Sequence, residues 1–240
     1  MSLKVYSGWW GSFSNMLMPP YCVLCNQPSE VDCLCNACKA DLPFAHRPCY
    51  RCGLPLGSEK DRICGACMIS KPPFHRTISP LAYSFPVDRM LQSFKFNRQL
   101  VHGRVLAQLL VESIQHTEGK MPDIIIPVPL HSIRLLMRGF NQSFELSSHC
   151  SRVLKIPQIS SSLRRRRNTP AQSGLSRSER RRNLRHAFYW TGTDIRGLHI
   201  ALVDDVLTTG STVTECAKLL LRSGAARVDV WTAARAVPKH

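Results

Sequence analysis

The chain has 240 residues, enough for one globular domain of ordinary size and a smaller module. Its hydrophobic fraction of 44% is normal for a globular core, and the absence of a long apolar run excludes a membrane-spanning protein. Lys and Arg number 32 against 16 Asp and Glu, and this formal net charge of +16 favours an anionic partner. The N-terminus lacks the apolar core and cleavage site of a signal peptide, so we expect a cytoplasmic protein without stable membrane insertion.

Four CxxC pairs follow one another near the start of the chain. Two such pairs can complete a tetrahedral shell of four thiolates around one metal ion. The sequence therefore predicts one or two structural zinc ions, bound by Cys22, Cys25, Cys35, Cys38, Cys49, Cys52, Cys64 and Cys67. Cys33 can replace Cys35, and the pairs can be sequential or interleaved. The alternatives are free or redox cysteines and the disulfide framework of an exported protein.

Composition divides the chain into a module, a linker and a domain. Residues 1–70 are expected to form a double zinc-ribbon-like module whose folding energy comes from the metal, because so short a segment buries little apolar surface. Prolines and polar residues in "ISKPPFHRTISP" oppose regular structure and predict a linker at residues 71–82. Residues 83–240 form the second domain.

Predicted helices and strands alternate in this second domain. Helical spacing covers residues 99–115, 141–154 and 212–222, with Asn141 as a candidate cap. Apolar runs predict buried strands in "DIIIPVP", "HIALVDD" and "RVDVWTAA". Strands that alternate with helices indicate an α/β fold with a mostly parallel, doubly wound sheet.

The stretch "HIALVDDVLTTGSTV" gives the clearest functional signal. Its two carboxylates stand at the carboxyl end of a predicted strand, where open α/β sheets bind ligands. The following loop and helix start attract a phosphate, whereas carboxylates accept hydrogen bonds from ligand hydroxyls. A ribose 5-phosphate unit satisfies both groups, and magnesium on the ligand oxygens offsets the charge. The expected contacts are Asp204, Asp205, Thr208, Thr209, Gly210, Ser211 and Thr212.

This stretch resembles the phosphoribosyl pyrophosphate (PRPP) fingerprint of type I phosphoribosyltransferases, which is two acids followed by a Thr-Thr-Gly-x-Thr loop. The alternative is an ordinary strand-to-helix turn. The wider chain resembles the ComF family, in which a cysteine-rich zinc module precedes a transferase-like domain. The resemblance rests on the PRPP loop and on "CVLC", "CYRCG", "FKFNRQ", "PVPLHSIRLLMRGFNQS" and "QSGLSRSERRRNLRHAF".

The resemblance implies a type I phosphoribosyltransferase-like fold for residues 83–240. It also implies that "PVPLH" is a pyrophosphate loop after the first sheet strand, with Asn141 close by. Its contacts would be Val128, Pro129, Leu130, His131, Arg134 and Arg138. Taken alone, "RGFNQ" is equally well explained as a capped helix start.

A run of arginines carries half of the formal charge. Nine Arg and one Glu between Arg164 and His186 give +8, and two zinc ions, each bound by four thiolates, would reduce the chain's total only to about +12. The resemblance makes residues 164–186 a flexible loop that covers the active site as a hood. Nine arginines exceed what PRPP needs, so we predict contact with the backbone of single-stranded DNA. The residues concerned are Arg164, Arg165, Arg166, Arg167, Arg177, Arg180, Arg181, Arg182 and Arg185. A solvated face and a hood for PRPP alone are the alternatives.

Two functions remain open. The ComF resemblance implies a PRPP-binding protein that handles single-stranded DNA during natural transformation. Its protein partners would be other DNA-uptake proteins, such as a helicase or a recombination mediator. The alternative is an active phosphoribosyltransferase that transfers the phosphoribosyl group from PRPP to an unknown base or other acceptor.

Overall fold

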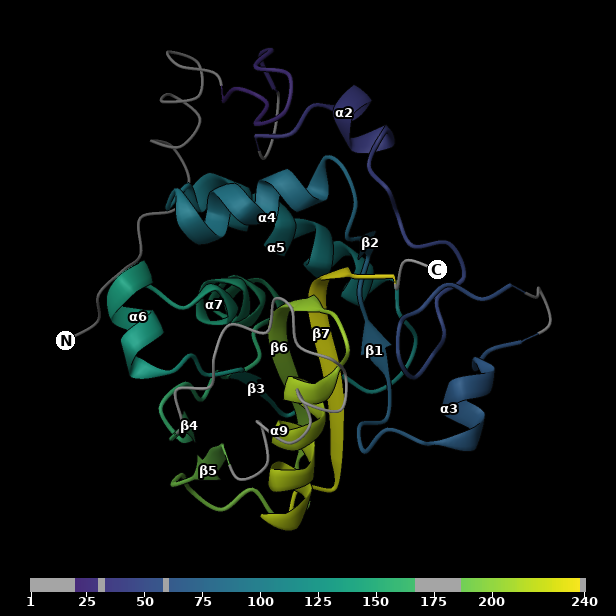
Figure 1. Ribbon diagram of the computed structural model, residues 1–240, viewed down its shortest axis with the longest axis vertical. Helices are drawn as coiled ribbons and strands as arrows, with labels where there is room; N and C mark the ends of the chain where they lie inside the picture. Colours follow the sequence, from purple (N-terminus) through teal and green to yellow (C-terminus); the bar gives the residue numbers. More distant parts are fainter. Residues whose placement is uncertain (1–19, 30–32, 58–60, 167–186, 238–240) are drawn as a thin grey trace. The chain divides into compact units, whose positions relative to one another are not determined.

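The computed structural model describes residues 20–29, 33–57, 61–166 and 187–237. The chain divides into two compact units, Met1–Leu42 and Pro43–His240. The first unit contains helix α2 (Asn36–Ala40), and the second contains the named strands (Figure 1). Among the described residues, no helix has both the length and the hydropathy needed to cross a membrane.

A parallel sheet forms the centre of the second unit. Strand β6 (His199–Leu207) lies between β3 (Ile124–Pro127) and β7 (Arg227–Arg235). Two short strands, β1 (Thr77–Ile78) and β2 (Leu81–Ala82), pair with the outer side of β7. Each of these pairings is parallel, which confirms the mostly parallel sheet predicted from the alternation of strands and helices.

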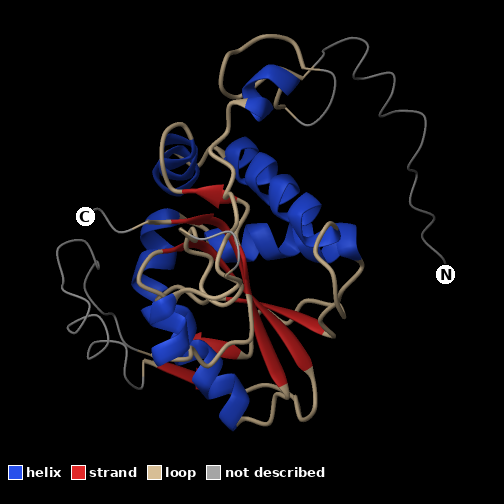
Figure 2. Cartoon of the chain, turned by 90° about the vertical axis from the view of Figure 1, so that its right-hand side faces the viewer, coloured by secondary structure: helices blue, strands red, loops and turns tan. Residues whose placement is uncertain are grey.

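Helices cover both faces of this sheet (Figure 2). Helices α5 (Leu100–Gln115) and α7 (Gln142–Leu154) pack on one face, and α4 (Val87–Phe96) packs against α5. Helix α9 (Ser211–Arg222) covers the other face, where its side chains share a buried apolar cluster with Ile200 and Leu202. Because neighbouring side chains on a strand point to opposite faces, the next residues of β6 face α5 and α7. The doubly wound arrangement is therefore confirmed.

The elements with a clear periodic signal begin and end close to their predicted bounds. The helix predicted at 99–115 is α5, and the one predicted at 141–154 is α7, whose cap Asn141 accepts the N–H of Ser143 at 3.1 Å. Strand β6 runs two residues beyond the predicted "HIALVDD", so both carboxylates stand inside the strand.

Residues 71–82 were predicted to be a linker, and the structure corrects this. They contribute β1 and β2 to the sheet, because a proline is tolerated between two very short edge strands. Residues 43–70, which carry the last two CxxC pairs, are called the second cysteine segment. Backbone N–H groups of Thr77 and Ala82 donate to the carbonyls of Tyr50 and Pro43, and these bonds attach the second cysteine segment to the sheet. The boundary between the units consequently falls at Leu42 and Pro43, inside the expected 1–70 module. The "PVPLH" loop also follows β3 rather than the first strand.

Besides α2, α4, β1 and β2, four short elements had no predicted counterpart. They are helices α3 (Gly65–Ile69) and α6 (Ser132–Arg138) and strands β4 (Leu163–Arg165) and β5 (Phe188–Trp190). Strands β4 and β5 form a separate antiparallel pair. None of the four is longer than seven residues, too short to show a helical or alternating period.

A buried carboxylate joins three strands at their amino ends. Asp229 of β7 is fully buried, and its oxygens lie 2.6 Å from Arg76 Nε, 2.9 Å from Arg227 Nε and 3.1 Å from His199 Nε2. Burial by itself raises the pKa of Asp229, but the bonds from His199, Arg227 and Arg76 outweigh it and lower the pKa to about 2. This end of the sheet therefore holds a carboxylate that is ionised at neutral pH, between two guanidinium groups and an imidazole.

Candidate functional site

Two adjacent carboxylates lie at the carboxyl end of β6. Asp204 Oδ1 accepts hydrogen bonds from Ser143 Oγ at 3.0 Å and from the N–H of Asp205 at 2.9 Å. Asp205 Oδ2 lies 2.7 Å from Lys95 Nζ of α4. Burial, and then the charge of Asp205, raise the pKa of Asp204 to about 7. A pKa near 7 means that Asp204 can gain or lose its proton near neutral pH, while the ammonium group of Lys95 lies beside Asp205.

A tight loop connects these carboxylates to α9. Gly210 has a φ of +75°, in the left-handed region that favours glycine, and α9 begins at the next residue. Thr209 Oγ1 and Ser211 Oγ lie 2.9 Å apart, and Thr208 is exposed. The first N–H groups of a helix have no partner within the helix and attract anions. The loop can thus hold a phosphate one turn from the acid pair.

The "PVPLH" segment reaches the same edge of the sheet. The N–H of Val128 donates to the carbonyl of Val203, and Asn141 Nδ2 donates to the carbonyl of Val128. Because the Val128 side chain is buried and both its N–H and its carbonyl are paired, the backbone donors that this segment can offer to an anion are the N–H groups of Leu130 and His131. His131 caps α6, and its Nδ1 accepts the N–H of Ile133 at 3.3 Å. Asn141 and Ser143, at the start of α7, therefore connect the predicted pyrophosphate loop to the acid pair.

Guanidinium groups from two further elements interact electrostatically with one another and with Asp204. Burial, and then the charge of Arg138, lower the pKa of Arg134 on α6. Burial, and then the charge of Arg134, lower the pKa of Arg165 on β4, whereas Asp204 acts in the opposite direction. These shifts mean that Arg134, Arg165 and Asp204 are close enough to interact. Mutual repulsion among the arginines is relieved when an anion binds between them.

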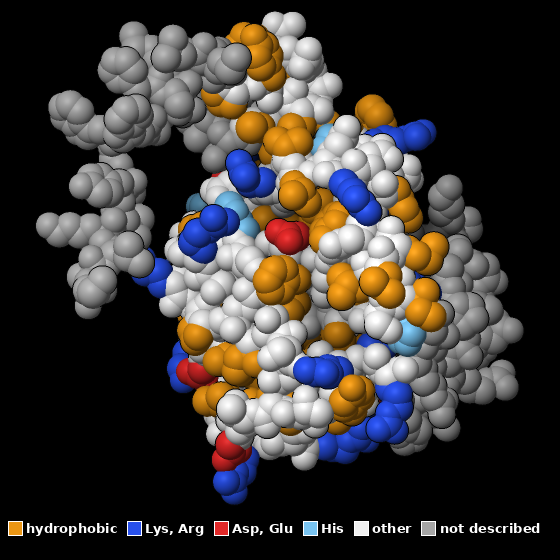
Figure 3. Space-filling view, turned by 90° about the vertical axis from the view of Figure 1, so that its left-hand side faces the viewer, with side chains coloured by type: hydrophobic (Ala, Val, Ile, Leu, Met, Phe, Trp, Pro, Cys, Tyr) orange, Lys and Arg blue, Asp and Glu red, His pale blue; other side chains and the backbone are white. Residues whose placement is uncertain are grey.

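Helix α6 adds an apolar rim. It has no buried residue, and Leu136 and Met137 are 82% and 77% exposed. The Arg138 guanidinium lies 5.2 Å from the centre of the Phe96 ring and links α6 to α4. Hydrophobic side chains are interspersed with Lys and Arg on this face of the molecule (Figure 3).

The structure describes only the first part of the arginine run. Arg164 and Arg165 lie in β4, and Arg166 follows them. The guanidinium groups of Arg165 and Arg166 lie 5.5 Å and 5.4 Å from the ring centres of Phe188 and Tyr189 in β5. The remaining predicted nucleic-acid contacts lie outside the described residues: Arg167, Arg177, Arg180, Arg181, Arg182 and Arg185.

Arg235 is a site residue that sequence reasoning missed. It ends β7, is 6% exposed, and donates to the carbonyls of Cys52 at 2.8 Å, Leu207 at 2.6 Å and Thr208. One side chain therefore joins the second cysteine segment to the loop before α9. Lys95 and Ser143 were also missed, although Lys95 lies inside the "FKFNRQ" motif.

The eight predicted cysteine ligands form two separate clusters. In each cluster the four sulfur atoms lie within 4.8 Å of one another; the sets are Cys22, Cys25, Cys35 and Cys38, and Cys49, Cys52, Cys64 and Cys67. The pairs are therefore sequential, and Cys35 rather than Cys33 joins the first cluster. The Sγ atoms of Cys25 and Cys35 are 3.7 Å apart. Tetrahedral zinc requires a separation of about 3.8 Å, so the thiol groups fit this metal.

Backbone N–H groups stabilise the thiolate form of one cysteine in each cluster. Burial by itself raises the pKa of Cys22, but N–H groups of Cys25, Cys35 and Leu24 outweigh it and lower the pKa to about 6. The same opposition lowers the pKa of Cys49 to about 7. A thiolate is the form that binds zinc, so each cluster presents a ligand that ionises near neutral pH.

Known proteins match the sequence of the cysteine-rich segment and also the sequence of nearly the whole chain. Residues 13–68 match the double zinc ribbon domain. DNA utilization protein YhgH of Salmonella typhi is 38% identical over 226 residues, which cover 92% of this chain and 99% of that protein. Competence protein F of Haemophilus influenzae is 37% identical over 210 residues, 85% of this chain and 90% of that protein. The chain belongs to the ComF family.

Family membership confirms the ComF resemblance seen in the motifs. The α/β unit has the mostly parallel, doubly wound sheet that this resemblance implied. Among solved structures, a purine phosphoribosyltransferase from Pyrococcus horikoshii matches 54% of the ComF-family chain and 70% of its own length, with 17% identity and a TM-score of 0.35.

We expect the purified ComF-family protein to contain two zinc ions per chain. Cys35→Ser and Cys64→Ser each remove one ligand, from the first and second cluster respectively, and should each lower the content toward one ion. Because the second cluster belongs to the unit that contains the sheet, only Cys64→Ser should lower the melting temperature of that unit. Elemental analysis and scanning calorimetry measure these effects. Reduced protein without metal, or equal thermal effects of both variants, contradicts the expectation.

We expect Arg235→Met to destabilise the protein and to speed zinc loss from the second cluster. A buried carbonyl left without a donor costs about 1–3 kcal/mol. Four carbonyls lose the Arg235 donor, and Leu207 keeps the N–H of Ala236. Arg222→Met, at an exposed position on α9, is the control and should change the unfolding free energy by less than about 1 kcal/mol. Urea denaturation and a chromogenic chelator provide the two measurements. Equal behaviour of the two variants would show that the Arg235 tether contributes nothing.

Proposed function

We propose that this ComF-family protein binds PRPP with magnesium and handles single-stranded DNA during natural transformation. The observation that carries PRPP binding is the position of Asp204 and Asp205, directly before the glycine loop and the start of α9. The names of the relatives, DNA utilization protein and competence protein, support the DNA-handling role. Two thiolate-rich clusters suit a reducing compartment, which supports a cytoplasmic location.

The proposed binding mode assigns each part of PRPP to a different group. The 5-phosphate contacts the backbone and hydroxyls of Thr208 to Thr212, and the ribose hydroxyls donate to the two carboxylates. The pyrophosphate contacts the backbone N–H groups of Leu130 and His131, because the N–H of Val128 is bonded to Val203 and Pro129 has none. Arg134 and Arg138 follow on α6. Lys95 already neutralises part of the charge of Asp205, so a polyanion can approach. Magnesium, when bound together with PRPP, would offset the remaining negative charge.

Asp204→Asn combined with Asp205→Asn should weaken PRPP binding tens- to hundreds-fold, because hydrogen bonds to charged groups contribute about 1.5–3 kcal/mol each. In the wild type, binding should also strengthen between pH 6 and pH 8, as Asp204, with its pKa of about 7, becomes ionised. The double variant should lose the part of this pH dependence that exceeds the titration of PRPP itself. Calorimetry with magnesium measures both effects.

The control for this experiment removes two exposed carboxylates elsewhere, by Asp41→Asn combined with Glu118→Gln. It should bind PRPP as the wild type does. Equal affinity of the wild type and the Asp204 and Asp205 double variant would exclude the proposed ribose contact.

The described part of the arginine run supports the DNA-handling role. Strands β4 and β5 place Arg165 and Arg166 over Phe188 and Tyr189, and a pocket of about 390 Å³ beside them is lined by Arg166, Tyr189, Trp190 and Arg222 among others. Arginine forks contact phosphates, and aromatic rings stack on bases without sequence preference. This part of the run thus combines the two kinds of side chain that bind single strands.

Neutralising Arg177, Arg180, Arg181 and Arg182 to Gln should weaken binding of all single-stranded sequences alike. Each phosphate contact adds roughly −0.7 to the slope of log affinity against log salt, so the slope should become less steep by up to roughly 3. The matched control changes four exposed cations elsewhere, Lys71, Arg89, Arg104 and Arg152, to Gln. A salt titration in which both quadruple variants keep the wild-type slope would place the DNA elsewhere.

Transferase activity is a second candidate function, and one observation favours it. A carboxyl group with a pKa near 7, such as that of Asp204, can exchange a proton at neutral pH, as acid–base catalysts do. Pyrophosphate release from PRPP, screened over bases and nucleosides, tests for turnover. Pyrophosphate release that depends on an acceptor would establish the enzyme. If no acceptor causes release, binding without transfer is favoured.

A further inference from the structure

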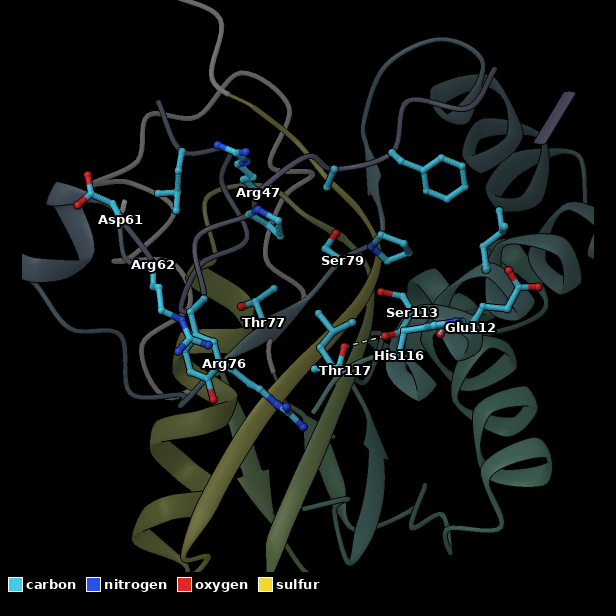
Figure 4. A pocket seen from close by; sticks show the side chains of 18 residues that line it. Arg47, Asp61, Arg62, Arg76, Thr77, Ser79, Glu112, Ser113, His116 and Thr117 are labelled. Carbon is cyan, nitrogen blue, oxygen red and sulfur yellow. Dashed lines mark hydrogen bonds between the residues drawn. The ribbon is translucent and has the colours of Figure 1, made fainter. Parts of the chain in front are cut away.

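A second pocket, of about 710 Å³, lies between the second cysteine segment, the sheet edge and α5 (Figure 4). Its described lining includes Arg47, Tyr50 and Arg62 from the cysteine segment. From the end of α5 and the two residues that follow it come Glu112, Ser113, His116 and Thr117. The lining includes neither the acid pair nor the loop before α9. All of its residues belong to the unit Pro43–His240, so the pocket is built within one compact body.

One polar group in this pocket lacks a partner. The Ser79 side chain is 4% exposed, and its Oγ has no hydrogen bond to any described residue. Ser79 lines the pocket between the two groups of polar side chains (Figure 4). A buried hydroxyl without a partner destabilises a folded protein, and such groups are rare. A ligand in the pocket would supply the missing hydrogen bond.

The wall formed by the cysteine segment suits a phosphate. Arg47 and Arg62 lie on this side of the pocket (Figure 4), and both are exposed. The Arg62 guanidinium lies 6.0 Å from the centre of the Tyr50 ring. Asp61 lines the same wall, so the described side chains there comprise two guanidinium groups and one carboxylate. Arg76 also lines the pocket, but its charge is matched by Asp229. A guanidinium group can donate two parallel hydrogen bonds to two oxygens of one phosphate.

The opposite wall suits the ring of a base. Helix α5 contributes Glu112, Ser113 and His116, which offer hydrogen-bond donors and acceptors (Figure 4). Apolar side chains, among them Phe44 and Leu109, provide flat contact area in the same pocket. A planar ligand with apolar faces and polar edges fits such a lining. One wall suits a phosphate and the opposite wall suits a base, so the pocket as a whole fits a nucleotide.

We propose that this pocket binds one 5′-phosphorylated nucleotide unit. The phosphate contacts Arg47 and Arg62, the base faces α5, and the ligand completes the hydrogen bonding of Ser79. A free nucleoside monophosphate and the 5′ end of a single DNA strand both offer this chemistry. The pocket shares no residue with the proposed PRPP site, so the two proposals stand or fall separately.

Calorimetry on the full-length, zinc-containing protein tests the pocket, with deoxynucleoside 5′-monophosphates as probes and saturating PRPP and magnesium present. Arg62→Gln should weaken nucleotide binding roughly 10- to 100-fold, because it removes a charge-assisted contact. Arg104→Gln, at an exposed position on α5 outside the pocket, is the matched control and should bind as the wild type does. Ser79→Ala should weaken binding several-fold, by roughly 2- to 12-fold, without lowering the melting temperature of the unliganded protein.

Oligonucleotides of eight thymidines, with and without a 5′-phosphate, identify the source of the nucleotide. If the phosphorylated strand binds more tightly than the unphosphorylated one, and Arg62→Gln abolishes this difference, the pocket is assigned to strand ends. Binding of the monophosphate alone, with the same Arg62 dependence, assigns it to free nucleotides. Three results overturn the proposal: no binding of either probe, displacement of the nucleotide by PRPP, or binding that neither Arg62→Gln nor Ser79→Ala changes. A lower melting temperature of Ser79→Ala with unchanged binding would make this hydroxyl structural and also count against the site.

Discussion

Strands β6 and β7 end side by side, and one arginine fixes both ends. Leu207 and Arg235 are partners in the sheet register, and the Arg235 side chain donates to the carbonyls of Leu207 and Thr208. It also donates to Cys52, so the second cysteine cluster and the start of α9 are held by the same group. A guanidinium suits this position because its donors are arranged in a rigid plane. The second cysteine cluster and the candidate phosphate loop are therefore attached to each other within one compact unit.

The two ends of the sheet use buried carboxylates in opposite ways. At the amino ends, Asp229 lies among Arg76, Arg227 and His199, and these groups keep its pKa at about 2. At the carboxyl ends, Asp204 lies beside a second acid, and burial raises its pKa to about 7. The first arrangement is satisfied without a ligand and stabilises the fold. The second is incompletely compensated, which is typical of a site that awaits a ligand or a cation.

Local signals explain what could be predicted from the sequence. Apolar runs and helical spacing identified β3, β6, β7, α5, α7 and α9, because each signal lies within one element. The loop after Asp205 was recognisable for the same reason. The prolines near β1 and β2 predicted a linker, since a sequence does not reveal that β7 offers an edge with which two-residue strands can pair.

Contacts between distant segments explain what could not be predicted. The spacing of the cysteines gave the ligand chemistry, but their sequential grouping and the exclusion of Cys33 depend on the folded chain. Lys95, Ser143 and Arg235 reach the acid pair or its loop from α4, α7 and β7, so no stretch of sequence joins them to Asp204. For the arginine run, β4 shows regular structure at Arg164 and Arg165, and the segment from Arg167 to Arg185 lies outside the described residues.

The most direct measurement concerns the place where the ligand phosphate binds. Amide resonances of the isotopically labelled protein can be followed while ribose 5-phosphate and magnesium are added. If the loop before α9 holds the phosphate, the largest shifts fall on the amides of Thr209, Gly210, Ser211 and Thr212, which lie at the start of the helix. Saturation of the protein with ligand while these amides stay unshifted would contradict the proposed site.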